Sequence, residues 1–304
     1  MKRRALATGM LAAGAAALGA TGWRWRARVA ERAAFAAHYT TPVATPDGPV
    51  AVYHLGHSLV GRDMPAMLAE LGGHRWNSQL GWGASLKDHW LGAVPGFAEE
   101  NASAAFRPAG EALDSGGYPV VVLTEMVELR DAIRWHDSAD HLALWALRAR
   151  AANPAVRVCL YETWHRLDDP AGWQSRTEAD LVSLWEDEVL RPAVATAGVI
   201  HVIPGGQVMV AVAAEAEAGR IPGLSGRAGL FADAIHFNDI GAWLMAMTHF
   251  AAIYARSPLG LPAALRRADG SAATAPLPAA ALAMQAVVWR VVRGYALTGV
   301  AAAE

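Results

Sequence analysis

Short apolar runs alternate with longer amphipathic segments along most of this chain. The runs are rich in Val, Ile and Leu and have the length of buried strands. We expect strands at 50–55, 75–80, 120–123, 156–161 and 199–203. Apolar positions three and four residues apart, the spacing of one helix face, predict helices at 62–71, 138–151, 176–197 and 239–255.

The alternation of strands and helices indicates a fold class. Apolar strands separated by helices favour a parallel sheet with helices on both faces, so we predict an α/β domain. Sheets of this kind bind ligands beyond the carboxyl ends of their strands. We therefore look for candidate chemistry in the loops that follow the predicted strands.

The first 26 residues are predicted to be a signal peptide or an N-terminal membrane anchor. Positive charge at 1–4 precedes an uncharged stretch of Ala and Gly at 5–20, as in an export signal. The basic aromatic cluster at 23–26 equally suits an uncleaved helix at a membrane interface. An ordinary N-terminal helix of a soluble protein is the remaining alternative. We expect an exported protein, periplasmic or extracellular, that could stay attached to the membrane.

Composition divides the rest of the chain into three parts. Residues 27–48 are interpreted as a helix followed by a linker that contains Pro and Thr. Residues 49–257 hold all the predicted strands and form the main domain. In 258–304, a connection rich in Ala, Gly and Pro leads to an apolar helix at 279–292, which we expect to pack back on the main domain.

Charge and cysteine content narrow the classes of function. The 26 basic and 28 acidic side chains leave a formal charge of -2, which gives no electrostatic case for a nucleic-acid partner and fits a small neutral substrate better. The single cysteine, Cys159, lies in an apolar run and is interpreted as a packed thiol. The sequence has no zinc-protease, calcium-loop, phosphate-loop or dinucleotide motif. We predict neither a metal nor a cofactor.

Two short segments carry candidate catalytic residues. Ser58 stands in Gly-His-Ser-Leu at 56–59, after the first strand and before a helix, where its backbone amide could stabilise negative charge. A serine that caps the helix is the simpler alternative. Asp233 and His236 precede the last helix of the main domain, and their spacing lets a carboxylate orient an imidazole that takes a proton from a serine. A surface aspartate beside a satisfied histidine is the alternative here.

Together these segments resemble the SGNH, or GDSL-like, hydrolase family. The family's first block, Gly-Asp-Ser-Leu, is matched at 56–59 with His57 in place of the acid, and its last block, Asp-x-x-His, is matched by Asp233 and His236. The resemblance covers about 49–256. It implies a flavodoxin-like three-layer α/β/α sandwich with a parallel sheet of about five strands. It also implies ester hydrolysis through an acyl-enzyme on the serine.

The family places two more donors around the oxyanion, a glycine after the second strand and an asparagine after the third. Gly83 stands where the glycine is expected and would form the oxyanion hole with the Ser58 amide, while Gly81 is the reserve choice. The asparagine is missing, because Thr124 and Glu125 follow the third strand instead. An ionised Glu125 would repel an oxyanion, so it cannot simply replace the amide.

Three roles are open for Glu125. It could be protonated in a dry pocket, bonded to Arg130, or turned toward substrate hydroxyl groups, while Thr124 could supply the lost hydrogen bond. If the amide is all that is missing, Glu125→Asn is expected to raise turnover. A missing donor can cost about 2.7 to 4 kcal/mol of transition-state stabilisation, so weak activity or none also agrees with the sequence.

Further residues at the same edge are predicted to line a substrate pocket. Trp164 and His165 follow the fourth strand, and an aromatic face beside polar groups suits a sugar ring or a small acyl ester. Plain packing of Trp164 beneath its loop is the alternative. His57, Thr124 and Glu125 complete the predicted pocket.

The sequence therefore predicts a secreted or membrane-anchored serine esterase that removes a short acyl group, with O-acetyl groups on carbohydrate as the candidate substrate. The carbohydrate part follows the habits of the family, because a fold does not determine a substrate. Acyl transfer to a sugar or lipid hydroxyl is an alternative that shares the acyl-enzyme. A binding protein that keeps the fold without efficient catalysis is another, and His57 and the absent asparagine favour it.

Overall fold

The computed structural model describes residues 29–302, and the chain separates into two units at Thr41. In the first unit, residues 29–37 are helical and the ring centroids of Phe35 and Tyr39 lie 5.3 Å apart. The predicted signal peptide or anchor, residues 1–26, lies outside the described residues. Within 29–302, no helix combines the length and the apolar character needed to cross a membrane.

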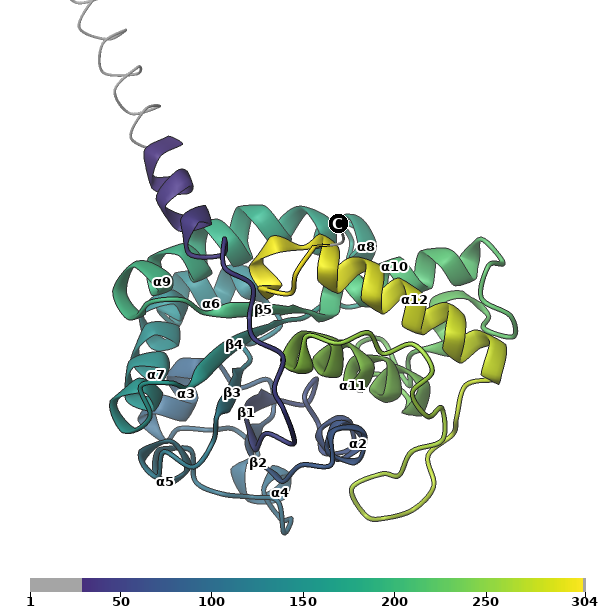
Figure 1. Ribbon diagram of the computed structural model, residues 1–304, viewed down its shortest axis with the longest axis horizontal. Helices are drawn as coiled ribbons and strands as arrows, with labels where there is room; N and C mark the ends of the chain where they lie inside the picture. Colours follow the sequence, from purple (N-terminus) through teal and green to yellow (C-terminus); the bar gives the residue numbers. More distant parts are fainter. Residues whose placement is uncertain (1–28, 303–304) are drawn as a thin grey trace, which may run out of the picture. The chain divides into compact units, whose positions relative to one another are not determined.

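The second unit is built on one sheet of five parallel strands in the order β2-β1-β3-β4-β5 (Figure 1). The strands are β1 (Val52–His57), β2 (Trp76–Gly81), β3 (Val120–Leu123), β4 (Arg157–Glu162) and β5 (His201–Pro204). All five strand predictions are confirmed, with boundaries displaced by at most two residues. This strand order is that of flavodoxin-like folds, so the predicted fold class is confirmed.

Helices cover both faces of the sheet, which makes it a three-layer α/β/α sandwich. One face carries α2 (Asp63–Gly72), α10 (Gly205–Glu217), α11 (Asp239–Tyr254) and α12 (Pro278–Gly294). The other face carries α3 (Leu86–Leu91), α5 (Ala109–Asp114), α7 (Ser138–Ala152) and α9 (Arg191–Ala197). Figure 1 shows α11 and α12 on the opposite side of the strands from α7. Right-handed crossovers between parallel strands produce this division of the helices.

The predicted helices differ from the structure in two ways. The helix expected at 176–197 is continuous but consists of α8 (Trp173–Asp180), a π-helical segment η1 (Leu181–Leu190) and α9. Five helices have no counterpart among the predictions: α3, α4 (Phe97–Glu100), α5, α6 (Leu129–Trp135) and α10. Four of these five span seven residues or fewer, too short for a periodic pattern to show. The short 3-10 helices η2 (Gly226–Gly229) and η3 (Ala296–Thr298) complete the elements.

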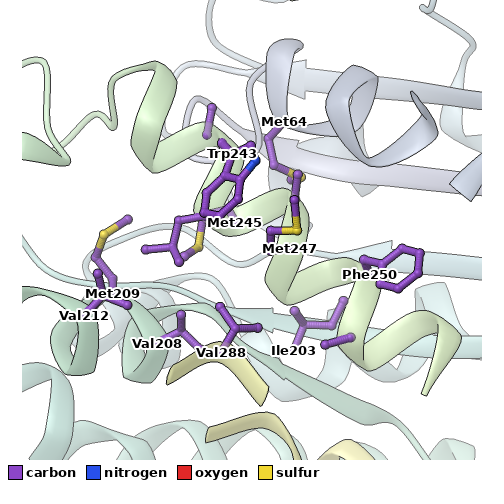
Figure 2. Close-up of a cluster of buried hydrophobic side chains, with 14 of the residues drawn as sticks. Met64, Ile203, Val208, Met209, Val212, Trp243, Met245, Met247, Phe250 and Val288 are labelled. Atoms are coloured by element: carbon purple, nitrogen blue, oxygen red, sulfur yellow. The ribbon is translucent and has the colours of Figure 1, made fainter. Parts of the chain in front are cut away.

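The main apolar cluster lies between the sheet and α2, α10, α11 and α12 (Figure 2). Met64, Trp243 and Met247 in this cluster are each at most 1% exposed. α11 is buried continuously from Gly241 to Tyr254. Close packing of this kind resists displacement, so α11 is a firm support for the loop that precedes it. Cys159 is buried in β4.

Candidate active site

Ser58 stands in a tight turn at the carboxyl end of β1. The carbonyl of His57 accepts hydrogen bonds from the Val60 amide at 2.9 Å and the Gly61 amide at 3.3 Å. α2 begins at Asp63, so Ser58 lies between β1 and a helix, as predicted. The turn presents the half-buried serine at the carboxyl edge of the sheet.

Asp233 and His236 lie in the loop that leads into α11. Asp233 Oδ1 accepts from the backbone amides of Ile235 at 2.8 Å and His236 at 2.7 Å, so the carboxylate itself shapes the turn. At the other end of the loop, Asn238 Oδ1 caps α11 by accepting from two amides of its first turn. A side-chain hydrogen bond at each end therefore fixes the conformation of the loop.

The three predicted catalytic side chains meet in the structure. His236 Nδ1 donates to Asp233 Oδ2 at 2.7 Å, and Ser58 Oγ donates to His236 Nε2 at 3.0 Å. Both distances are within the range of direct hydrogen bonds. A hydroxyl, an imidazole and a carboxylate in this order can activate a serine as a nucleophile.

The charge on Asp233 follows from its hydrogen bonds. The His236 amide has the largest effect, and together with the His236 ring and the Ile235 amide it holds the pKa of the Asp233 carboxyl well below its ordinary value. The carboxylate is therefore ionised at neutral pH and keeps the proton of the imidazole on Nδ1, which leaves Nε2 free to accept. The His236 side chain is 45% exposed, so a substrate can reach it.

Gly83 lies next to the serine turn. His57 pairs with Gly81 across β1 and β2, so the segments that contain Ser58 and Gly83 leave the sheet side by side. Gly83 has a φ of 56°, which glycine adopts without strain. Within the described residues, neither the Ser58 amide nor the Gly83 amide has a hydrogen-bond acceptor. Both N–H groups are available to an oxyanion, whereas Gly81, the reserve choice, is a buried strand residue.

His57, which replaces the acid of the family's first block, is completely buried. Its Nε2 donates to the Glu125 carbonyl at 2.8 Å, and its Nδ1 accepts from the Leu59 amide at 3.3 Å. Burial lowers the pKa of His57 to about 4, so the ring is neutral. His57 ties the serine turn to the loop after β3, and the prediction that it lines a substrate pocket is wrong.

The Glu125 side chain is also completely buried. Its Oε1 accepts from the Leu86 amide at 3.2 Å and the Met126 amide at 2.7 Å, and its Oε2 lies 2.7 Å from Ser138 Oγ. Burial raises the pKa of Glu125 to about 7, against the opposing effect of these three hydrogen bonds. Of the three roles open to Glu125, the carboxyl in a dry environment agrees with the structure.

The other contacts expected for the side chains of this segment are wrong. Arg130 pairs with Asp180 at 3.4 Å, and not with Glu125. Glu125 does not reach solvent, so it cannot face substrate hydroxyl groups. The effect of Glu125→Asn on turnover stays a prediction, and the shorter side chain would also separate three donors from their acceptor. Thr124 is fully buried and its Oγ1 has no partner within the described residues, so it lines no open pocket.

Trp164 and His165 lie below the surface, and the prediction that they form a pocket wall is wrong. Trp164 is 0% exposed and packs against the rings of Phe231 and Phe237. His165 is 3% exposed, and its Nε2 lies 2.9 Å from Asp180 Oδ2. The packing alternative for Trp164 is the one that agrees with the structure.

Buried Trp164 supports the loop of the catalytic candidates. Its Nε1 donates to the Ile235 carbonyl at 2.9 Å. The Leu167 amide donates to the Ala234 carbonyl at 2.7 Å, so the loop after β4 makes two hydrogen bonds to the segment between Asp233 and His236.

A cluster of charges around the buried Arg176 holds the loop after β4 in turn. Arg176, on α8, forms ion pairs with Glu128, Asp169 and Asp180. Glu128 follows β3 and Asp169 follows β4, so one guanidinium joins two of the loops around the site. Pairing on three sides explains how Arg176 can be buried as a charged group.

One hollow elsewhere in residues 29–302 lacks a serine and a carboxylate among the residues that line it. This hollow of about 500 Å³ lies at the opposite edge of the sheet, where Pro119, Val156 and Val199 line it. An apolar hollow is the usual first guess for a ligand site, but the serine that bonds to an imidazole and a carboxylate is at the carboxyl edge, and groups capable of chemistry decide the assignment. Within residues 29–302, no three His, Cys, Asp or Glu side chains gather as a metal ion would require.

The resemblance to SGNH hydrolases rests on the motif residues and their geometry. A scan against models of known protein families gave no match, and a search of curated proteins gave none. The family assignment therefore stays a prediction.

Three residues hold the site in roles that were not predicted from the sequence. Asn238 had a readable signal, because an asparagine directly before a predicted helix is typical of an N-cap. Ser138, at the start of α7, meets Glu125 only because the loop after β3 packs against the start of α7. The hydrogen bond from Trp164 to Ile235 likewise depends on tertiary packing and had no local signal.

Proposed function

We propose that this protein is a serine esterase of the SGNH type that removes a short acyl group, with O-acetyl groups on carbohydrate as the substrate class. The observation that carries the proposal is the pair of hydrogen bonds, 3.0 Å from Ser58 to His236 and 2.7 Å from His236 to Asp233. Motifs far apart in the sequence pointed to these same three residues. Agreement between motif and geometry is stronger support than either alone.

In the proposed reaction, Ser58 Oγ attacks the ester carbonyl and passes its proton to His236 Nε2. His236 then gives this proton to the leaving alkoxide, so the alcohol departs and the acyl group stays on the serine. A water molecule, deprotonated by His236, attacks the acyl-enzyme, and the acid leaves as the serine regains its proton. The Asp233 carboxylate stabilises the imidazolium in both halves.

The amides of Ser58 and Gly83 are the donors proposed for the oxyanion. Neither Thr124 nor Glu125 is placed to replace the family's asparagine, because both side chains are buried. Loss of one donor costs about 2.7 to 4 kcal/mol of transition-state stabilisation. We therefore expect a slower enzyme than a member of the family with all three donors.

A binding protein of the same fold with little catalysis is the second candidate, and the missing oxyanion donor favours it. Acyl transfer shares the acyl-enzyme with hydrolysis and differs only in the acceptor that replaces water. The N-terminal residues favour export for each of these functions.

A fluorophosphonate probe tests whether the serine is activated. Full-length protein is expected to be labelled, and Ser58→Ala and His236→Ala are expected to lose the labelling because they remove the nucleophile and its base. Ser183→Ala, at an exposed serine on η1, is the matched control and should label like the wild type. Folded protein that takes no label would favour the binding function.

The acyl preference needs a separate experiment. We expect the rate of cleavage of p-nitrophenyl esters to fall from acetyl to butyryl to octanoyl. Ser58→Ala should abolish all three reactions. Equal rates for short and long chains would contradict the short-acyl preference while leaving the esterase in place.

A further inference from the structure

Trp82 is an aromatic side chain at the rim of the candidate site, and it is 55% exposed. It directly follows Gly81, which pairs with His57 across β2 and β1, and it directly precedes Gly83. A single exposed apolar side chain is ordinary on a protein surface. The case for a function depends on how the ring is held.

Two contacts fix the Trp82 ring. Its Nε1 donates to Glu100 Oε1 at 2.9 Å. One face of the ring lies on Gly96, where an added Cβ would come within 2.2 to 2.5 Å of three indole atoms. The φ of 63° at Gly96 also favours glycine. The ring is therefore held in one orientation, with its remaining surface in solvent.

Two hydrogen bonds to neighbouring residues of one helix link this ring to the segment after Ser58. Arg62, in the segment between Ser58 and α2, donates from Nη2 to the Glu99 carbonyl at 2.8 Å. Glu99 and Glu100 belong to α4, which lies beside β2 (Figure 1). The Trp82 ring, the Glu100 carboxylate and the segment that follows Ser58 are thus linked through α4.

We propose that Trp82 is the stacking surface for a sugar ring of the substrate and that Glu100 accepts hydrogen bonds from the sugar hydroxyl groups. A flat indole face can cover the C–H face of a pyranose, and a carboxylate beside it matches hydroxyl donors. The site holds the alcohol part of a carbohydrate ester while the acyl group lies at Ser58. This inference rests on the proposed function and adds the part of the substrate that the catalytic residues do not contact.

The charges near the ring favour a neutral sugar over a lipid surface. Glu100 is hydrogen-bonded to Trp82, and a carboxylate is repelled by the anionic lipids of a membrane. Sugar hydroxyl groups, in contrast, donate to carboxylates. An exposed ring with a carboxylate bonded to it therefore fits a carbohydrate better.

Calorimetric titration with partially O-acetylated xylohexaose tests this site. The full-length Ser58→Ala protein is used, so that the probe binds without cleavage. Adding Trp82→Ala is expected to weaken binding about tenfold because one aromatic contact is lost, and Trp82→Phe, which keeps a ring, should lose less. Leu91→Ala is the control, since Leu91 is 64% exposed but has no ring. Equal affinity with and without Trp82, or no binding of the probe, overturns the inference.

Failure of this inference can be told apart from failure of the proposed function. If the wild type cleaves p-nitrophenyl acetate but xylohexaose binds independently of Trp82, the esterase stands and the sugar site does not. If p-nitrophenyl acetate is not cleaved while binding still depends on Trp82, the sugar site stands and the esterase does not. Trp82-dependent binding to phosphatidylcholine vesicles, without binding of xylohexaose, would replace the sugar by a lipid surface and overturn the inference.

Discussion

Buried polar side chains hold the candidate nucleophile in position. The His57 ring bonds to the backbone of Glu125, and the Glu125 carboxyl bonds to the Leu86 amide of α3 and the Ser138 hydroxyl of α7. Three segments around Ser58 are joined in this way. Because neither His57 nor Glu125 reaches solvent, both act by positioning and not by contact with a substrate.

The buried carboxyl of Glu125 links stability to pH. Its pKa is raised from 4.5 to about 7, mainly by burial. Between these values the folded protein holds a proton that the unfolded chain has lost, so the free energy of unfolding falls as the pH rises. The stabilisation is complete below pH 4.5 and is lost as the pH passes about 7.

Glu125→Gln is expected to remove this part of the pH dependence. The glutamine oxygen can accept from the Leu86 and Met126 amides, and its NH₂ group can donate to Ser138 Oγ, so the variant keeps the hydrogen bonds without a buried charge. Between pH 4.5 and about 7, the free energy of unfolding of the wild type should fall relative to that of the variant, by up to about 1.4 kcal/mol per pH unit. Above about pH 7 the variant should keep the advantage gained over this range. Urea unfolding at a series of pH values measures this difference.

The exposed Glu178→Gln controls for the removal of one carboxyl group. If Glu125→Gln and the wild type keep a constant difference in the free energy of unfolding across the pH range, Glu125 is not the group that takes up the proton.

Among single residues, the catalytic candidates could be predicted from the sequence, and the side chains that surround them could not. Asp233 and His236 are three residues apart, so one turn brings them together whatever the rest of the chain does. Ser58 joins them because it follows a strand whose carboxyl end faces the same edge. The burial of Glu125 and Trp164 depends on which segments pack over them, and no local pattern reports that.

Among the elements, the loop after β4 has a supporting role that its sequence did not suggest. Trp164 and Leu167 bond to the backbone between Asp233 and His236, and Arg176 ties the same loop to α8. The histidine is thereby held by a neighbouring loop as well as by its own turn. A general base works only if it stays within hydrogen-bonding reach of the hydroxyl.

Trp164→Phe is expected to loosen this support. The variant keeps an aromatic ring against Phe231 and Phe237 but loses the hydrogen bond to Ile235, which lowers the free energy of unfolding by about 1 kcal/mol. We expect kcat for p-nitrophenyl acetate to fall severalfold with KM unchanged, because the imidazole is less well placed while the binding surface remains.

Trp173→Phe is the matched control for this prediction. Trp173 is 3% exposed and also lies against Phe231, with ring centroids 5.9 Å apart, but makes no hydrogen bond to the loop of His236. The two variants should differ in kcat. An equal loss of kcat in both would mean that general packing, and not the hydrogen bond of Trp164, supports the loop.

The helices show which elements a pattern can predict. The long amphipathic ones, α2, α7, α11 and α12, were expected within two residues of their ends. α10 was not, because it opens with Gly205 and Gly206, which usually indicate a turn. In the structure, a Cβ on Gly206 would come within 2.3 Å of Glu162 Oε1, so these glycines allow the helix to start against the end of β4. The close contact with β4 therefore explains why two glycines stand at the start of this helix, where their local preference is for a turn.

For the molecule as a whole, the alternation of strands and helices was enough to predict the layers. Parallel strands need crossover helices, and the handedness of crossovers assigns each helix to a face. The order of the strands was implied only by the family resemblance, because periodicity does not show which strands are neighbours. The C-terminal segment was expected to pack on the main domain, and in the structure α12 contributes buried side chains to the main core.

Because α12 packs into the main core, we expect it to unfold together with the rest of the second unit. Met284 is 0% exposed in α12, within the same cluster as the α11 side chains. Met284→Ala is expected to lower the free energy of unfolding of the whole unit by about 2 to 5 kcal/mol, as removal of a buried side chain from a shared core does. Unfolding followed by fluorescence and by circular dichroism should still give one coincident transition.

Leu282→Ala is the control on the same helix, because Leu282 is 53% exposed and surface changes are usually within about 0.5 kcal/mol. If Met284→Ala instead produced an early transition that involves only part of the helical signal, α12 would be able to detach while the sheet stays folded. A single transition, lowered by Met284→Ala and not by Leu282→Ala, means that the sheet carrying Ser58 and the helix that closes its core unfold together.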